Sequence, residues 1–392
     1  MSSASTIPQR PATVRLGALD TLRGLIMVLM ALDHASFFIS RVHPFEYWNL
    51  GLPHYQDAGW FITRWITHLC APGFFFLMGA GLVYFRASRL EAGWSETRVT
   101  RHLMGRGALL ILVSYLLEMA VWLLPERFSP AGTTMTPVSG DQIPFLVLTV
   151  LVTLGLTMLL SAPLLGLSRR SWLAMAFIAI MAPNFLIPTL RGQDPAAGVF
   201  LHLFVVPGTS GFVASMYPLL PWFGICALGV GFAHLLRNDA NRALRALLPM
   251  GLAYLVGFAG IRYGGGFGNL MVPTGSSLQS FLTVIKYPPS LAFCLLTLGI
   301  NLSLLSLIHR AGSWLDPVRR LLSVYGQAPL FFYLTHLWLF CLLRLAIFRD
   351  AAPDRWVLYA VWIGGVALLF PACAWYRRLK AARPPESLLR LF

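Results

Sequence analysis

The sequence contains ten long apolar segments, and these constrain the fold more than any other feature. A helix needs about 20 mostly apolar residues to cross a bilayer. The chain is 57% hydrophobic and only 11% charged, whereas soluble proteins carry about 25% charged residues. The sequence therefore predicts a polytopic membrane protein. The expected spans are 18–40, 60–85, 104–124, 143–166, 172–190, 214–236, 245–262, 287–308, 325–347 and 355–376.

These segments predict an all-α bundle of about ten transmembrane helices that forms one membrane domain over residues 1–392. A shorter apolar stretch near 197–207 is expected to be re-entrant or interfacial. The first segment contains ionisable residues and lacks a clear small-x-small cleavage site, so it is expected to be a retained span and not a signal peptide.

The net charge of +15 is explained by topology. Most of the 30 Lys and Arg residues fall in the head (1–15), in alternate loops and in the tail (377–392). Ten crossings place all of these on one side of the membrane, and basic loops face the cytoplasm. Both termini are therefore expected in the cytoplasm, and no nucleic-acid partner is expected.

The cysteines all fall inside apolar segments. Their odd number, the absence of a loop cysteine and the absence of CxxC spacing argue against a disulfide framework or a metal site. We expect small buried side chains at Cys70, Cys226, Cys294, Cys341 and Cys373.

The first apolar segment carries an ordered set of ionisable side chains. Asp20, Arg23 and His34 stand on one face of a helix, with His34 about 16 Å beyond Arg23. Asp33 points about 100° away from that face and is not expected to orient the ring of His34. Ionisable residues inside a membrane are costly, so they mark candidate functional sites.

The second segment has a matching stripe. Asp57, Arg64 and His68 are spaced at i, i+7 and i+11, again on one helical face. Since the two helices run antiparallel, His68 is expected near the depth of His34, with Arg64 and Asp33 close by in the outer half of the bilayer. Three explanations stay open here: a proton-transfer site, polar contacts that hold helices together, and a pair of haem ligands.

The first segment resembles the first-helix motif of integral membrane acyltransferases, through Leu19-Asp20-x-Leu22-Arg23-Gly24 followed by His34. More closely, the chain is similar to the bacterial branch of the heparan-α-glucosaminide N-acetyltransferase catalytic-domain family. The blocks that carry this resemblance begin at His68 (HLCAPGFFFLMG), Tyr217 (YPLLPWFG), Lys286 (KYPPS) and Tyr325 (YGQAPLFFYLTH).

The resemblance implies a membrane transferase that modifies a glycan. It would move an acetyl group from cytoplasmic acetyl-CoA to an amino or hydroxyl group of a sugar across the membrane, without metal or haem. A bacterial inner membrane is the expected location. The catalytic histidine stays open between His34, which we favour, and His54, which is the nearest counterpart of the working histidine in lysosomal members of the family.

Each candidate residue has an expected role. His34 acts as general base or acyl relay, Asp33 and His68 shape the pocket, and Arg64 stabilises the oxyanion. The expected acetyl-CoA site contains Asp20, Arg23, Arg86, Arg89 and Arg101. The expected acceptor site contains Trp48, Asp57, Trp60, Lys286 and His336, with Tyr47 and Tyr55 as further rings that could stack on a sugar.

Several alternatives stay open at this point. The arginines could serve topology alone, and the aromatic rings could form the interfacial belt of a membrane protein. His336, three residues after Tyr333, could be a structural histidine. A proton-coupled transporter of a small solute would also carry polar stripes on facing helices. The nature of the acceptor, the length of the acyl chain and the formation of a homodimer are left open by the sequence.

Overall fold

The computed structural model describes residues 12–127, 145–190, 198–273, 275–384 and 387. The chain is 76% helical. Its α-helices are α1 (Ala12–Ala35), α2 (Ala58–Thr67), α3 (Cys70–Glu91), α4 (Glu96–Val113), α5 (Met119–Arg127), α6 (Val150–Ser161), α7 (Arg169–Leu190), α8 (Val199–Phe204), α9 (Leu219–Asn238), α10 (Ala240–Gly264), α11 (Leu278–Leu282), α12 (Leu291–Arg310), α13 (Asp316–Gln327), α14 (Pro329–Ala346) and α15 (Arg355–Ala381).

The multi-pass helical architecture is confirmed. Within the described ranges, nine helices are long and apolar enough to cross a membrane. The expected span 143–166 corresponds to a shorter apolar helix, Val150–Leu164, and the first two residues of that expected span lie outside the described residues. In the described part of the apolar stretch near 197–207, the structure has the short helix α8.

Several spans are interrupted, and the interruptions shape the interior of the protein. The expected span 60–85 is divided into α2 and α3 at His68–Leu69. Two π-helical segments, η1 (Ser36–Ser40) and η2 (Ser114–Glu118), follow α1 and α4. Short π segments inside helices are frequent at functional sites because they redirect side chains.

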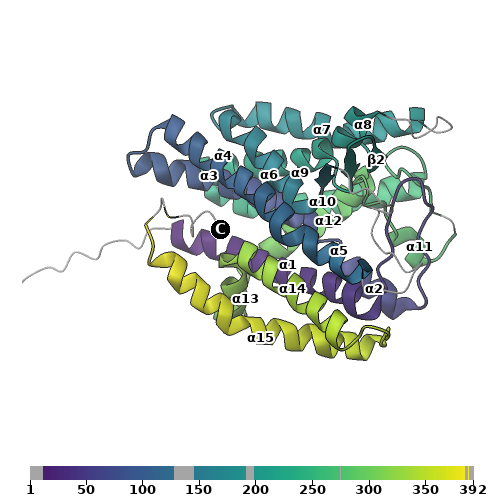
Figure 1. The fold of residues 1–392 in the computed structure, drawn as a ribbon. Coiled ribbons are helices and arrows are strands. Elements are labelled where there is room, and N and C mark those ends of the chain that lie inside the picture. The colour runs from purple at the N-terminus through teal and green to yellow at the C-terminus, as the bar shows by residue number, and fades with distance from the viewer. Residues whose placement is uncertain (1–11, 128–144, 191–197, 274, 385–386, 388–392) are drawn as a thin grey trace, which may run out of the picture.

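A small sheet, which the sequence did not predict, covers one end of the bundle. Strand β3 (Val213–Ser215) lies between β1 (Leu146–Leu148), to which it is parallel, and β2 (Gly208–Ser210), to which it is antiparallel. The central pairs are Val147 with Ala214 and Thr209 with Ala214. The sheet lies beside α8, away from the chain ends (Figure 1).

Glycines allow the closest helix contacts. A Cβ on Gly229 of α9 would stand 1.9 Å from the backbone oxygen of Phe76 on α3, and one on Gly79 would stand 2.0 Å from the oxygen of Cys226. At the other side of the bundle, Gly24 of α1 meets the backbone of Leu322 on α13 in the same way. Small residues let backbones approach where lipid supplies no hydrophobic drive between helices.

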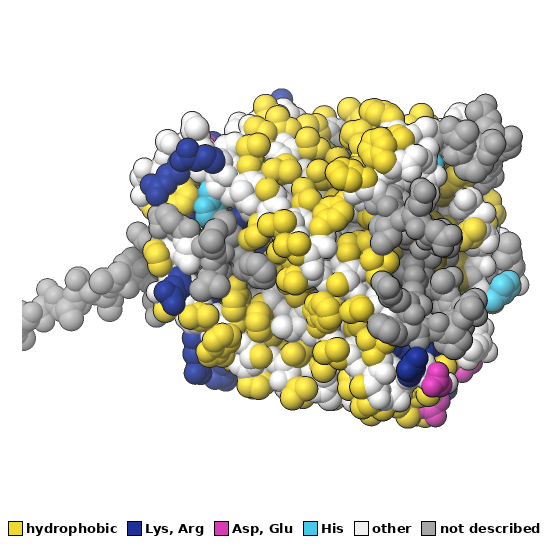
Figure 2. Space-filling view, in the orientation of Figure 1, with side chains coloured by type: hydrophobic (Ala, Val, Ile, Leu, Met, Phe, Trp, Pro, Cys, Tyr) yellow, Lys and Arg dark blue, Asp and Glu magenta, His cyan; other side chains and the backbone are white. Residues whose placement is uncertain are grey.

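The start of α1 and the end of α15 lie at the same end of the molecule (Figure 1). On the face seen in Figure 2, Lys and Arg side chains gather at that end and hydrophobic side chains cover the middle. This arrangement agrees with the charge pattern from which we predicted that both termini share one side of the membrane.

Candidate active site

A cavity of about 160 Å³ opens between α1, α5, α14 and the sheet. Its wall is rich in aromatic rings and holds several polar groups. The lining residues include Asp33, His34, His43, Tyr47, Glu118, Trp122, Val150, Ser215, Tyr217, Tyr287 and Tyr333.

His34 is oriented by a second histidine. His336 Nδ1 lies 2.6 Å from the carbonyl oxygen of Phe332 and must donate to it, which leaves His336 Nε2 as an acceptor. His34 Nδ1 lies 2.7 Å from His336 Nε2 and therefore donates the next hydrogen bond. The tautomer assigned in this way leaves His34 Nε2 with a free lone pair. His34 lines the cavity, so this nitrogen is available as a base.

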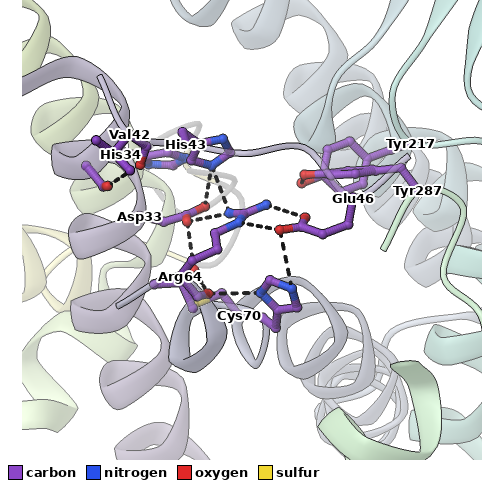
Figure 3. A network of polar contacts seen from close by, with 12 residues as sticks. Asp33, His34, Val42, His43, Glu46, Arg64, Cys70, Tyr217 and Tyr287 are labelled. Carbon is purple, nitrogen blue, oxygen red and sulfur yellow. Dashed lines mark hydrogen bonds and ion pairs between the residues drawn. The ribbon is translucent and has the colours of Figure 1, made fainter. Parts of the chain in front are cut away.

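A buried ion cluster stands beside this base. The guanidinium of Arg64 donates to both carboxylate oxygens of Glu46, at 2.8 and 2.7 Å, and to Oδ1 of Asp33 at 2.6 Å. Figure 3 shows Arg64 between the two acids. Arg64 is 4% exposed and Glu46 is fully buried. One cation is thus shared by two carboxylates, and the buried Lys286 adds a second positive charge near both acids.

Glu46 is kept ionised by its partners. Burial alone raises the pKa of its carboxyl, but the charge of Arg64, with a smaller contribution from His68, brings the pKa down to about 2. The bidentate hydrogen bond to Arg64 acts in the same direction.

His43 lies at the edge of the cluster. Burial and the positive charge of Arg64 lower the pKa of His43, so its ring is neutral at neutral pH. Its Nε2 lies 2.8 Å from Arg64 Nη1 and 3.3 Å from Asp33 Oδ2. A guanidinium can only donate, so we assign Nε2 as the acceptor from Arg64. Asp33 Oδ2 then receives no hydrogen bond from His43. Asp33 lines the cavity.

Glu118 is a further acid in the wall. Its carboxylate accepts hydrogen bonds from the hydroxyls of Tyr333 at 2.6 Å, Ser114 at 2.5 Å and Thr149 at 2.9 Å, and a long one of 3.5 Å from Trp122 Nε1. Glu118 closes the π-helical segment η2 and is 1% exposed. The rings of Tyr333 and Trp122 both stand edge-on to His34, with centroids 5.9 and 5.6 Å away.

Two more cavities adjoin this one in turn, and the last lies at the basic end of the protein. A cavity of about 430 Å³ shares Val150 and Tyr333 with the first, and a third of about 300 Å³ shares Phe85, Arg106 and Lys380 with the second. Arginine, lysine and histidine side chains line the third cavity, namely Arg89, His102, Arg106, Arg377 and Lys380. The three cavities therefore form a series between the basic end and His34.

The first-helix motif packs α1 against α13 and also lines the second of these cavities. Arg23 pairs with Asp20 at 2.9 Å and donates to the carbonyl oxygen of Gly326 at 3.1 Å, while Gln327 donates to the other oxygen of Asp20. Asp20 and Arg23 both line the 430 Å³ cavity. These contacts attach the start of α1 to the end of α13.

Of the arginines of α3 and α4 predicted to bind acetyl-CoA, only one lines one of these cavities. Arg89 lines the third cavity and stacks on Phe85 and Trp94, with its guanidinium carbon 5.1 and 5.4 Å from the ring centroids. Arg86 pairs with Glu96, and Arg101 is exposed. Neither of these two is part of the walls described above.

The residues predicted for the acceptor site also lie in different parts of the structure. Tyr47 stacks on Tyr287 in the cavity wall with centroids 5.2 Å apart. Trp48 packs with a separate cluster around Ile285, and Trp60 is buried in the main core. Asp57 accepts a hydrogen bond from the backbone of Trp60 as the N-cap of α2 and pairs with Arg355.

The remaining predicted residues also have defined surroundings. Lys286 is buried with its ammonium 5.0 Å from the ring centroid of Tyr287. His54 is exposed in the loop before α2. His68 faces the ion cluster, with Nδ1 2.9 Å from the carbonyl oxygen of Arg64 and Nε2 3.6 Å from Glu46. The expected contact of Arg64 with Asp33 is present, whereas the partner of His34 is His336 and not His68.

Sequence reasoning missed His43, Glu46, Glu118 and the role of Tyr333. Glu118 was detectable because it is an acid inside the expected span 104–124. His43 and Glu46 lie in a loop, where no periodic pattern marks them.

The buried positions expected for the cysteines are confirmed, and in the described parts of the chain no group of three or more His, Cys, Asp or Glu residues has the arrangement of a metal site.

The family model described as "Heparan-alpha-glucosaminide N-acetyltransferase, catalytic" matches residues 15–261. A comparison with curated proteins gave no match. The match includes His34, the ion cluster and Glu118. Tyr287 and Tyr333 complete the cavity wall from beyond the matched residues, and His336, also beyond them, contacts His34.

Proposed function

Because the chain belongs to the heparan-alpha-glucosaminide N-acetyltransferase catalytic family, we propose that it moves an acetyl group from cytoplasmic acetyl-CoA to a sugar on the other side of the membrane. Membership of this family and the apolar helices together make it a membrane acetyltransferase. The donor, the direction of transfer and the role of His34 are the parts that we propose.

The series of three cavities is the observation that carries the proposal. Its basic end suits the phosphates of CoA, since arginine and lysine bind phosphate oxygens with charge-assisted hydrogen bonds. Arg106 belongs to both the second and the third cavity, and its Nε is buried without a partner among the described residues. The pantetheine arm would follow the 430 Å³ cavity past Tyr333, which brings the thioester to His34.

His34 Nε2 is the proposed base. The amino or hydroxyl group of the acceptor attacks the thioester carbonyl carbon and gives a proton to His34 Nε2. The carbon–sulfur bond then breaks, and His34 returns the proton to the CoA thiolate. General bases of this kind contribute about 10²–10⁴-fold in rate. Attack of His34 itself to form an acyl-imidazole is the second route open to the same nitrogen.

One carboxylate oxygen of the site favours an amine as acceptor. Asp33 Oδ1 is occupied by Arg64 and Thr67, whereas Oδ2 has only the 3.3 Å contact with the accepting nitrogen of His43. This oxygen is suited to accept a hydrogen bond from an ammonium group. The ammonium loses one proton to water before His34 takes the second during attack.

The wall also suits a polyhydroxylated acceptor. Three buried polar atoms of lining residues have no hydrogen-bond partner among the described residues, namely His43 Nδ1, Tyr47 OH and Ser215 Oγ. Buried polar atoms are normally hydrogen-bonded, so sugar hydroxyls are natural partners. The stacked rings of Tyr47 and Tyr287 offer an apolar surface beside them.

The direct test uses purified protein in detergent, [¹⁴C]acetyl-CoA and a glucosamine-terminated oligosaccharide, with its N-acetylated form as control acceptor. The proposal expects label in the free-amine sugar. Protein that neither binds nor consumes acetyl-CoA would overturn the proposal and favour a proton-coupled transporter. Label in both sugars would keep the acetyltransferase but assign a hydroxyl as the acceptor.

A further inference from the structure

The size of the group that can reach His34 is set by two aromatic rings and one acid. Tyr333 lines both the cavity that contains His34 and the cavity that leads to it. An acyl group on the pantetheine arm has to pass this ring and then stop beside His34. The walls at that point decide which acyl groups fit, and the following inference rests on the proposed function.

Both walls beside His34 are flat aromatic rings. Tyr333 and Trp122 stand edge-on to the imidazole, at interplanar angles of 78° and 74°. Trp122 is held in turn by Phe38, which stacks on it with centroids 5.4 Å apart, and by Phe37, which meets it edge-on at 5.1 Å. Rings packed in this way yield little space to a longer chain because protein interiors are close-packed.

One carboxylate anchors both rings. Oε1 of Glu118 accepts the short hydrogen bond from Tyr333 and the longer one from Trp122, while Oε2 accepts from Ser114 and Thr149. No described residue places a cation on Glu118. An acid buried at membrane depth without a cation is costly, and two of its four hydrogen bonds hold the rings beside His34.

We propose that Glu118 is a positioning residue that holds Tyr333 and Trp122 against His34, and that these two rings restrict the transferred group to acetyl. The two parts of the proposal make separate predictions. Removal of a ring should admit a longer acyl chain. Removal of the carboxylate should loosen both rings at once, whereas glutamine, which keeps a carbonyl acceptor at the same position, should retain most of the restriction.

The experiment measures kcat/KM for acetyl-CoA and butyryl-CoA with the same acceptor. The result of interest is their ratio within each variant, because the fraction of folded protein cancels from it. We expect wild type to prefer acetyl-CoA by at least tenfold, since pockets that reject an extra methylene discriminate by about 10–200-fold. Tyr333→Ala, Trp122→Ala and Glu118→Ala should each raise the butyryl-to-acetyl ratio about tenfold, and Glu118→Gln should change it much less.

Tyr359→Phe is the matched control. Like the Tyr333 variants, Tyr359→Phe loses a hydroxyl that makes a hydrogen bond, in this case 2.6 Å from Thr63 Oγ1. Tyr359 itself lines neither of the two cavities. Its ratio should equal that of wild type. If an alanine variant does not fold, Tyr333→Phe and Trp122→Phe replace it in the test. Each should raise the butyryl-to-acetyl ratio by a smaller amount.

Two results would overturn the proposal without touching the proposed function: efficient use of butyryl-CoA by wild type, or an unchanged ratio in the ring variants while acetyl transfer persists. A wild-type protein that transfers no acyl group from either donor would remove the proposed function and this restriction together.

Discussion

His34 donates a 2.7 Å hydrogen bond to His336, and the carbonyl oxygen of Phe332 fixes the tautomer of that second ring. The two imidazoles are stacked at an angle of 14°. A base that depends on a second group for its orientation is a recurrent arrangement in acyl transfer. Here the second group is a neutral histidine, so His34 gains orientation without a neighbouring negative charge on its Nδ1 side.

Replacement of His336 should therefore impair catalysis more than binding. His336→Phe keeps an aromatic ring but removes the acceptor for His34 Nδ1–H, so the alternative tautomer becomes available. We expect kcat to fall by about 10²-fold, with the KM for acetyl-CoA nearly unchanged. Steady-state kinetics on purified protein measures the split, and a selective rise in KM would contradict this role.

Arg64 should be essential for stability because it is buried between two acids. Arg64→Met leaves Asp33 and Glu46 buried without their cation, and the loss of one member of a buried ion pair costs about 3–5 kcal/mol. The free energy of unfolding in detergent measures this change. Arg355→Met, which breaks an exposed pair with Asp57, is the control and should have a much smaller effect. Equal losses for the two variants would count against the ion cluster.

The ion cluster should lose stability as the pH falls. The pKa of Glu46 is about 2 in the folded protein, below its ordinary value of 4.5, so its contribution is complete above about pH 4.5 and disappears toward pH 2. The pKa of His43 is also lowered, from 6.5, so the unfolded chain binds a proton first as the pH drops below about 6.5. Thermal unfolding against pH should show a decline in both windows, and Glu46→Gln should make the lower one smaller. A profile that is the same in Glu46→Gln and wild type would contradict this assignment.

The contact of α3 with α9 should tolerate no side chain at Gly229. A Cβ at that position would lie 1.9 Å from the backbone oxygen of Phe76, so Gly229→Ala must separate the helices. We expect a loss of stability of about 1–3 kcal/mol, as for other overpacked cores. Gly364→Ala is the control, because a Cβ there meets nothing within 4 Å. Unfolding curves that agree for the two variants would disprove the close approach.

Affinity for acetyl-CoA should depend on the basic end of the cavity series. Arg106→Ala should raise the KM for acetyl-CoA about tenfold and weaken its salt dependence, because one charge-assisted phosphate contact is lost. Arg170→Ala removes an exposed arginine that does not line these cavities and should leave KM unchanged. Binding can be followed by titration with CoA at several salt concentrations. An unchanged CoA affinity in Arg106→Ala would exclude this end as the phosphate site.

The spans were predictable because a bilayer sets a length and composition for each one. The same rule identified His34, Arg64 and Asp33, whose polar groups are out of place in apolar segments. It should also have identified Glu118, which is the only acid in its expected span. Local sequence pattern was thus enough to find most of the groups that lie inside helices.

Partnerships across long distances in the chain were not predictable. His34 and His336 are 302 positions apart, and helical periodicity carries no information about which helices meet. Glu46 lies in a loop, and its importance follows only from the guanidinium that folds against it. The break at His68–Leu69 and the π-helical segment η2, which contributes Glu118 to the cavity wall, also depend on tertiary packing and not on local propensity.

Transfer across a sealed membrane tests the central claim most directly. Vesicles with the cytoplasmic face outward receive [¹⁴C]acetyl-CoA outside, with a glucosamine-terminated oligosaccharide trapped inside. The account predicts that wild type labels the enclosed sugar and that His34→Gln reduces the rate at least 10²-fold, while CoA binding persists. Labelling only when donor and acceptor share one side, or wild-type rates in His34→Gln, would contradict it.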